Sequence, residues 1–305
     1  MGELSKKIGE YGEKKVMEFL SLLGWQPIET GVTIECFNPS LHKRSEKRGT
    51  HGKDLGFTYH SPLSEGELID VFVSVKYSKN PYEENPRSKF HSHFSDLANG
   101  ISCYKKSSER VERINHFFKY SKVRTIGVLF WLNNSPKDSD KNLLSDLAIS
   151  RFHEDLDFEE IIVVTNEAYT FIKTSIREIK ARTSSEKIEF YYPATGKNLN
   201  PTTRKISGKI LPIEFLTSNI LPFRVKVSEN EWHLYLFSKQ PFSVSDFKRL
   251  VGLSIDISNG LAKKIIIGFS DYNELLDENS INVVLQSFEE KEFALENIFC
   301  INIDE

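Results

Sequence analysis

Two almost wholly apolar segments in the first half of the chain constrain the fold more than any other feature. Leu68–Tyr77 (LIDVFVSVKY) and Arg124–Leu132 (RTIGVLFWL) are rich in Val, Ile, Leu and Phe, a composition typical of buried strands. Such strands alternate here with segments of helical periodicity, so we predict an α/β domain with a mixed sheet covered by helices. The predicted elements are helices at 5–23, 93–119, 141–151 and 168–182, and strands at 31–37, 55–60, 68–77, 124–132 and 160–165.

The polar segment Ala181–Lys187 (ARTSSEK) follows this domain and marks a candidate boundary. We therefore predict two domains, at 1–183 and 184–305, of which the second is a smaller α+β domain and a candidate surface for partner docking. Its predicted elements are strands at 188–192, 205–213, 223–227, 232–237, 264–269 and 298–303 (an edge strand), with helices at 244–251 and 281–290.

Composition limits the class of protein. With 39% apolar residues over 305 positions the chain can bury a sizeable core, and no apolar run is long enough to cross a membrane. The charged N-terminus carries no apolar stretch of a secretory signal, so we expect a cytoplasmic protein without a membrane partner. The net charge of −3 does not by itself favour nucleic acid, but basic groups cluster at 42–53 and at 104–124.

The three cysteines, Cys36, Cys103 and Cys300, are far apart and show neither the spacing of a zinc site nor a disulfide framework. Five histidines lie between positions 42 and 93, and only His91 and His93 are close neighbours, with no CxxC nearby. The sequence therefore does not favour zinc.

A lysine near the end of an otherwise apolar strand marks the candidate functional site. Period-two alternation puts Ser74 and Lys76 on one face of the strand at 68–77. A buried ammonium group needs a partner of opposite charge, and Asp54 at the start of the preceding strand supplies one. The spacing of Asp54 and Lys76 fits two strands and a turn, so we predict a hairpin that brings them side by side, facing Glu13 on the N-terminal helix.

These residue types suit metal-dependent hydrolysis of a phosphodiester. Carboxylates hold a hard cation such as Mg²⁺ or Mn²⁺, which lowers the pKa of a bound water and stabilises charge on the phosphorus-bound oxygens. A neighbouring lysine orients the nucleophile or neutralises developing charge. We predict Asp54, Lys76, Glu13 and Ser74 as the catalytic group, with Asp54 and Glu13 as metal ligands. The alternatives are a structural ion pair at a sheet edge and a solvated helix charge.

This arrangement resembles the PD-(D/E)xK nuclease superfamily over residues 5–131, and the resemblance implies a restriction-endonuclease-like fold. Three pieces carry it, each weak alone. They are Gly9-x-x-Gly12-Glu13 with Gly24-Trp25 behind it as the first helix, Asp54 in place of the first acid, and Ser74-Val75-Lys76 in place of the acid-x-lysine half-motif.

The opening MGELSKKIGEYGEKKVMEFL is also similar to the A subunit of GAPS-type two-component anti-phage systems, in which a nuclease-like protein acts with a companion subunit. This narrower resemblance implies a bacterial defence role, DNA as the ligand and a hetero-oligomer.

Ser74 departs from the superfamily pattern, which has Glu or Asp there. A serine hydroxyl is a neutral, weak metal ligand, so one negative charge is missing. Either Glu13, Glu10 or Glu35 replaces it, or the site is degenerate. Two functions follow: a metal-dependent DNA endonuclease, and a DNA-binding sensor or scaffold that positions a catalytic partner. A purely protein-interacting subunit is a third class.

The basic clusters supply candidate phosphate contacts, because lysine and arginine carry most of the sequence-independent affinity for DNA. In the loop before the second strand and on the helix after the third, solvated faces are the competing interpretation. The predicted DNA-binding residues are Lys43, Arg44, Lys47, Arg48, Lys53, Lys105, Lys106 and Arg110.

Overall fold

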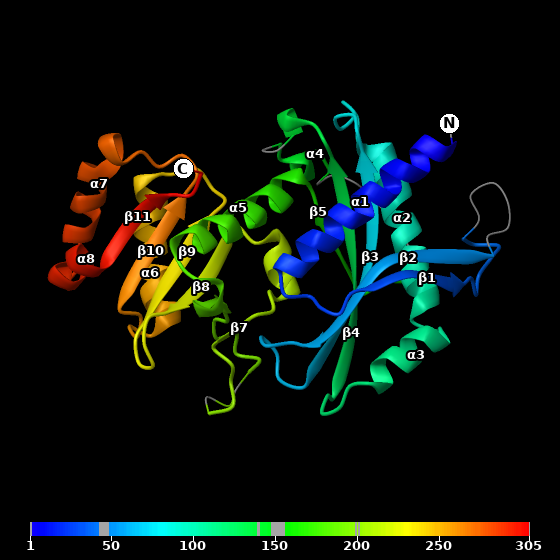
Figure 1. Cartoon of the computed structure of the whole chain (residues 1–305), viewed down its shortest axis with the longest axis horizontal. Coiled ribbons are helices and arrows are strands. Elements are labelled where there is room, and N and C mark those ends of the chain that lie inside the picture. Colours follow the sequence, from blue (N-terminus) through cyan, green and yellow to red (C-terminus); the bar gives the residue numbers. More distant parts are fainter. Residues whose placement is uncertain are drawn as a thin grey trace. The chain divides into compact units, whose positions relative to one another are not determined.

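The two apolar segments form adjacent parallel strands in the middle of a sheet (Figure 1). β3 (Glu67–Ser78) and β4 (Lys122–Asn133) pair along their whole length. Such pairing satisfies the backbone of strands whose side chains are buried on both faces.

The computed structural model describes residues 2–42, 49–138, 141–147, 156–198, 200 and 202–304.

Within these residues the first sheet has five strands in the spatial order β1-β2-β3-β4-β5. β1, β2 and β3 are antiparallel neighbours, whereas β3, β4 and β5 run parallel. The remaining strands are β1 (Glu29–Glu35), β2 (Thr50–His60) and β5 (Glu160–Val164). The predicted α/β fold with a mixed sheet is confirmed, although β2 begins inside the segment predicted as a loop.

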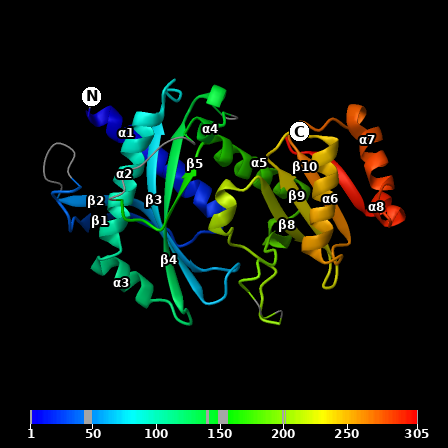
Figure 2. The same ribbon diagram turned by 180° about the vertical axis from the view of Figure 1, so that it is seen from behind.

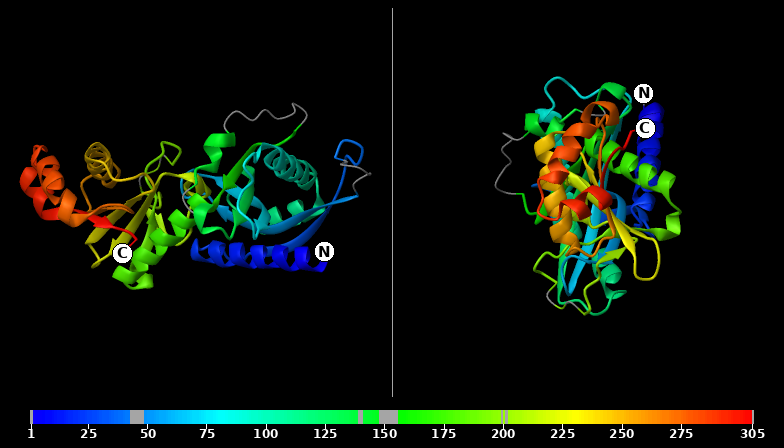
Figure 3. Two further views of the ribbon diagram at one scale, coloured as in Figure 1. Left: turned by 90° about the horizontal axis from the view of Figure 1, so that it is seen from above. Right: turned by 90° about the vertical axis from the view of Figure 1, so that its left-hand side faces the viewer.

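Helices cover both faces of this sheet. In Figure 1 α1 crosses in front of the strands, whereas in Figure 2, seen from behind, α2 lies in front of them, and the view from above in Figure 3 agrees. Contacts give the same division, because Gly12 of α1 lies against Tyr77 and Gly100 of α2 lies against Phe72. Odd and even positions of β3 thus face different helices. The helices of this part of the chain are α1 (Gly2–Leu22), α2 (Arg87–Tyr104), α3 (Ser108–Asn115) and α4 (Leu143–Leu147), and α5 (Asn166–Arg182) follows β5 in the sequence.

The end of α1 follows from its sequence. Gly24 adopts a φ of 75°, the left-handed conformation that glycine tolerates best. The N–H of Trp25 then bonds the carbonyl of Leu20 at 3.1 Å, and that of Gly24 bonds Ser21 at 3.1 Å. This pair of bonds is a Schellman motif, and it satisfies two carbonyls at the helix end.

Gly12 lets α1 approach β3 closely. A Cβ at Gly12 would overlap the Cβ of Tyr77, whereas a Cβ at Gly9 would meet nothing within 4 Å. We expect Gly12→Ala to lower the free energy of unfolding by about 1–3 kcal/mol through overpacking. The matched change Gly9→Ala is expected to raise it by up to about 1 kcal/mol through helix propensity. Urea unfolding of the two variants checks the contrast, and equal effects would show that α1 does not depend on close approach at Gly12.

The predicted single helix at 93–119 is wrong, because the chain forms two helices there. α2 ends at Tyr104, and α3 begins after Ser107, whose Oγ accepts the N–H of Arg110 at 3.3 Å. A serine that satisfies a free N–H in this way favours a new helix start over continuation. Hydrophobic periodicity alone does not reveal that break.

The described residues form two compact units: Met1–Ser61 with Gly66–Thr170, and Pro62–Glu65 with Phe171–Glu305. The second unit holds a six-stranded sheet, in the order β11-β10-β9-β8-β6-β7. The predicted edge strand at the C-terminus is confirmed, but the predicted strand at 205–213 shrinks to two residues. The elements are β6 (Ile188–Tyr191), β7 (Ser207–Gly208), β8 (Ile220–Lys226), β9 (Trp232–Ser238), β10 (Lys264–Phe269), β11 (Ile298–Asn302), α6 (Val244–Ser258), α7 (Glu274–Gln286) and α8 (Lys291–Asn297).

The core of the second unit lies between its sheet and its helices. Buried side chains from β9, β10 and α6, such as Leu234, Ile267 and Phe247, pack in one cluster. No helix among the described residues is both long enough and apolar enough to cross a membrane.

Candidate functional site

The candidate site lies where β2 and β3 separate. Their antiparallel pairing runs from His60 opposite Leu68 to Leu55 opposite Val73. Beyond that point the Asp54 side chain binds the backbone of β3, because its Oδ2 accepts the N–H of Val75 at 2.6 Å. A side chain thus satisfies a backbone group that a strand partner would otherwise bind.

An irregularity of β2 turns Asp54 toward β3. Lys53 and Gly56 are three residues apart, so strict alternation would put them on opposite faces. Yet the Lys53 side chain lies where a Cβ at Gly56 would be, and both lie on the same face. The strand therefore changes phase between them, a local departure from pleating that often re-aims a side chain beside a functional site.

Ser74 is buried, and its hydroxyl lowers the pKa of the Asp54 carboxyl, as a hydrogen-bond donor does. A hydroxyl that donates to a carboxylate stabilises the ionised form and fixes its direction. The residue that departs from the superfamily pattern is thus placed as a donor to Asp54.

Lys76 is held by an acid that the sequence did not reveal. Its Nζ lies 3.6 Å from Oδ2 of Asp96 on α2, and both side chains are partly buried. The sequence indicated that Lys76 needs an acidic partner, because it stands at the end of an apolar strand. The structure adds that α2 covers that face of the strand. Without the packing of α2 on β3, nothing distinguishes Asp96 from other acids.

Glu13 lies close enough to Asp54 and Lys76 to feel both charges. Partial burial raises the pKa of Glu13 above its ordinary value, the carboxylates of Asp54 and Glu10 raise it further, and Lys76 lowers it. The structure thus brings the acid of α1 to the place where β2 and β3 separate.

Asp54 is more deeply buried than Glu13. Burial raises its pKa, although the Val75 N–H, Lys76 and the Ser74 hydroxyl oppose the shift, and Asp96 adds to it. Loss of hydration penalises the charged form of a carboxylate, and these neighbours offset only part of that penalty.

The donor set fits a hard divalent cation. Three carboxylates, Glu13, Asp54 and Asp96, interact electrostatically with one lysine, Lys76, so negative charge is in excess. Within the described part of the chain these acids do not bring three ligand atoms to within 4.8 Å of one another. Mg²⁺ suits such an open arrangement, because it takes one or two carboxylates and keeps several waters.

The other acids considered as replacements, Glu10 and Glu35, are exposed, although Glu10 is close enough to Glu13 to raise its pKa. Glu10 is exposed and lies 3.8 Å from Lys6 on the same helix. Glu35 is exposed at the end of β1.

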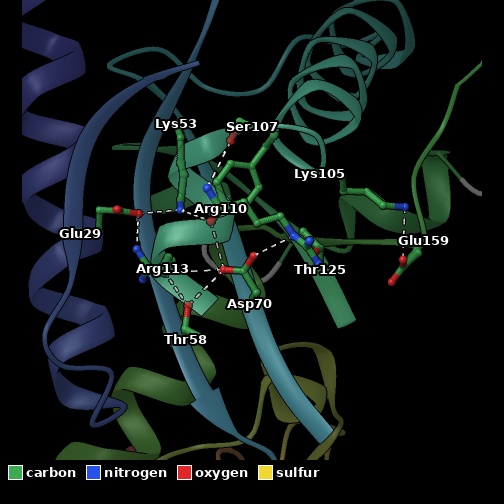
Figure 4. A network of polar contacts seen from close by, with 11 residues as sticks. Glu29, Lys53, Thr58, Asp70, Lys105, Ser107, Arg110, Arg113, Thr125 and Glu159 are labelled. Atoms are coloured by element: carbon green, nitrogen blue, oxygen red, sulfur yellow. Dashed lines mark hydrogen bonds and ion pairs between the residues drawn. The ribbon is translucent and has the colours of Figure 1, made fainter. Parts of the chain in front are cut away.

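Two residues predicted to contact DNA pair with acids of the first unit instead. The fully buried side chain of Lys53 places Nζ 2.6 Å from Oε2 of Glu29 and 3.1 Å from Oη of Tyr104 (Figure 4). Arg110 turns inward, with Nε 3.6 Å from Oδ2 of the buried Asp70. Buried charges require such partners, so these cations are engaged in the fold. The prediction of Lys53 and Arg110 as DNA contacts is corrected accordingly, because their charges are paired with Glu29 and Asp70.

The other predicted DNA contacts fall into two groups. Lys105 pairs with Glu159 at 3.2 Å near the end of α2, and Lys106 is exposed. The remaining four lie outside the described residues, and they are Lys43, Arg44, Lys47 and Arg48.

The part of the chain that carries this site matches a known protein family. Residues 1–168, more than half of the chain, match the family described as GAPS4 protein PD-(D/E)XK nuclease domain. No curated protein and no solved structure matches the chain. The matched segment contains all of β1 to β5 and all four residues of the predicted catalytic group. The chain therefore belongs to the GAPS4 family of PD-(D/E)XK nuclease-domain proteins.

Proposed function

We propose that this chain is a metal-dependent DNA endonuclease subunit of a bacterial anti-phage defence complex, hydrolysing phosphodiester bonds in invading DNA. One observation carries the proposal: the carboxylate of Asp54 accepts the Val75 N–H at 2.6 Å and lies within electrostatic reach of Glu13 and Lys76. The nuclease domain of the family supports the reaction class, and the family's name supports the defence role.

Each side chain has a role that its contacts support. Asp54 and Glu13 would hold the cation, and the Ser74 hydroxyl favours the ionised form of Asp54. Lys76, positioned by Asp96, directs its positive charge to the phosphate or the attacking water. When bound, Mg²⁺ or Mn²⁺ supplies a more acidic water and stabilises negative charge on the phosphate oxygens.

The direct test is cleavage of duplex and single-stranded DNA by the full chain, alone and with the companion encoded beside its gene. We expect cleavage with Mg²⁺ or Mn²⁺ and none with a chelator. We also propose residues 184–305 as the docking surface for that companion, which co-purification of the tagged full chain tests first. Binding of DNA without cleavage under every condition would contradict the endonuclease proposal.

The missing acid at position 74 gives a sharper prediction. If Glu13 supplies the second negative ligand, Glu13→Gln is expected to lower cleavage by about a hundredfold, because one charge that holds the cation is lost. Adding Ser74→Glu to that variant returns a carboxylate to the strand and is expected to restore part of the activity. Initial cleavage rates over a range of Mn²⁺ concentrations measure both effects.

Glu3→Gln is the matched control, since Glu3 lies on the same helix and its exposed side chain pairs with Lys7, with Oε1 2.9 Å from Nζ. It is expected to cleave like the unaltered chain. Full activity of Glu13→Gln would remove Glu13 from the site.

One observation favours a second function, a catalytically degenerate DNA sensor or scaffold: the buried hydroxyl of Ser74 stands where the superfamily has an acid. This function predicts salt-dependent DNA binding without cleavage. Replacing Lys43, Arg44, Lys47 and Arg48 with Ala is expected to reduce the slope of log K against log salt by about 3 to 4. An unchanged slope would exclude this segment as the phosphate-binding surface.

A further inference from the structure

Four side chains that the nuclease site does not use meet in the core of the first unit. Cys36, His42, His51 and Cys103 are all buried, and one ligand atom of each lies within 4.8 Å of the others. They come from separate places: the residue after β1, the turn that follows, β2, and the last turn of α2. Their spacing in the sequence resembles no zinc motif, which is why the sequence did not favour zinc.

The distances within this cluster match the edges of a zinc tetrahedron. Nδ1 of His42 lies 3.4 Å from Sγ of Cys36, 3.5 Å from Sγ of Cys103 and 3.2 Å from Nε2 of His51. Zinc binds sulfur at about 2.3 Å and nitrogen at about 2.0–2.1 Å, so a regular tetrahedron has N···S edges of about 3.5 Å and N···N edges of about 3.3 Å.

Hydrogen bonding alone accounts poorly for these contacts. An imidazole nitrogen carries either one proton or one lone pair, yet Nδ1 of His42 lies within 3.5 Å of three polar atoms. A cation at the centre of the four atoms accounts for all three contacts at once, because each atom directs its lone pair at the metal.

The surroundings suit a bound thiolate. The N–H of Phe37 donates to Sγ of Cys103 at 3.4 Å. Hydrogen bonds of this kind orient metal ligands and stabilise their charge. Both cysteines also belong to the apolar cluster that includes Phe94 and Ile101.

We propose that Cys36, His42, His51 and Cys103 form a structural zinc site. Four protein ligands leave no open position, as in structural rather than catalytic zinc sites. The metal links the β1–β2 connection to α2, and its ligands His42 and His51 lie on either side of residues 43–48 in the sequence. The proposal does not depend on nuclease activity.

The test is the metal content of the full chain, expressed with zinc and dialysed against metal-free buffer. We expect about one zinc per chain by mass spectrometry. Exchange of Co²⁺ for zinc is expected to give the thiolate-to-cobalt charge-transfer band and the visible bands of tetrahedral cobalt. A chain without zinc and without these bands, or with a disulfide between Cys36 and Cys103, would overturn the proposal.

Variants then assign the ligands. Cys36→Ser and Cys103→Ser are each expected to lose the zinc, whereas Cys300→Ser, a cysteine of the second unit, retains it. Asp54→Asn is also expected to retain zinc and the thiolate band, which separates this site from the carboxylate site. Zinc that persists at full stoichiometry in both cluster variants would contradict the assignment. If those variants fail to fold, the cobalt spectrum of the unaltered chain still decides.

Discussion

Replacing Asp54 with Asn is expected to lower metal-dependent DNA cleavage by at least about a hundredfold to a thousandfold while the chain stays folded. The loss follows because a neutral amide holds a divalent cation far more weakly than a carboxylate does, and the cation supplies several kcal/mol of transition-state stabilisation. The fold is expected to survive because the amide oxygen of Asn can still accept the Val75 N–H, which lies 2.6 Å from Oδ2 of Asp54.

Cleavage is measured as an initial rate with Mg²⁺ and with Mn²⁺, and folding by circular dichroism. The matched control is Asp271→Asn, since Asp271 also accepts a backbone N–H, that of Phe242 at 2.7 Å, but belongs to the second unit. Lys76→Met tests the other half of the site and is expected to cause a loss of similar size. Full cleavage by both Asp54→Asn and Lys76→Met would show that the reaction occurs elsewhere.

The second large effect concerns stability. Five charged residues form what we call the buried ionic cluster: Glu29, Lys53, Asp70, Arg110 and Arg113 (Figure 4). Asp70 is its centre, with no solvent exposure and Oδ1 3.1 Å from Oγ1 of Thr58 and 3.6 Å from Nε of Arg113. Without Asp70, three cations would face one acid.

Asp70→Ala is therefore expected to lower the free energy of unfolding by about 3–5 kcal/mol, the usual cost of leaving buried charges without their partner. Urea unfolding followed by circular dichroism measures the change. Glu83→Ala is the control, because Glu83 pairs with Lys89 at 2.9 Å in an exposed ion pair and its loss is expected to cost less than about 1 kcal/mol. Equal effects of the two changes would show that the cluster contributes little.

Lys53 shows that a basic segment of the sequence does not by itself identify residues that contact DNA. It stands in a basic segment, where a phosphate contact is the natural prediction, yet its side chain is fully buried against Glu29. Burial lowers the pKa of Lys53 most, because desolvation penalises the charged form, and the positive charge of Arg113 lowers it further. Only an exposed lysine or arginine can contact DNA, whereas a buried one pairs with acids of the protein. Exposure depends on the tertiary structure and cannot be read from the residue type.

The sequence by itself determined the mixed α/β sheet, because two long apolar strands need cover on both faces and the segments between the strands have helical periodicity. It also determined which short motifs matter, since a lysine at the end of such a strand requires an acid partner. The superfamily resemblance, which the family match bears out, rested on these residues.

Only the tertiary structure decided which acids and ligands come together. The change of phase in β2 turns Asp54 toward Val75, and the packing of α2 brings Asp96 to Lys76 and Cys103 to His42. These contacts join residues far apart in the chain, so no local spacing encodes them. They depend on how helices lie on the sheet, which is set by the summed packing of many side chains.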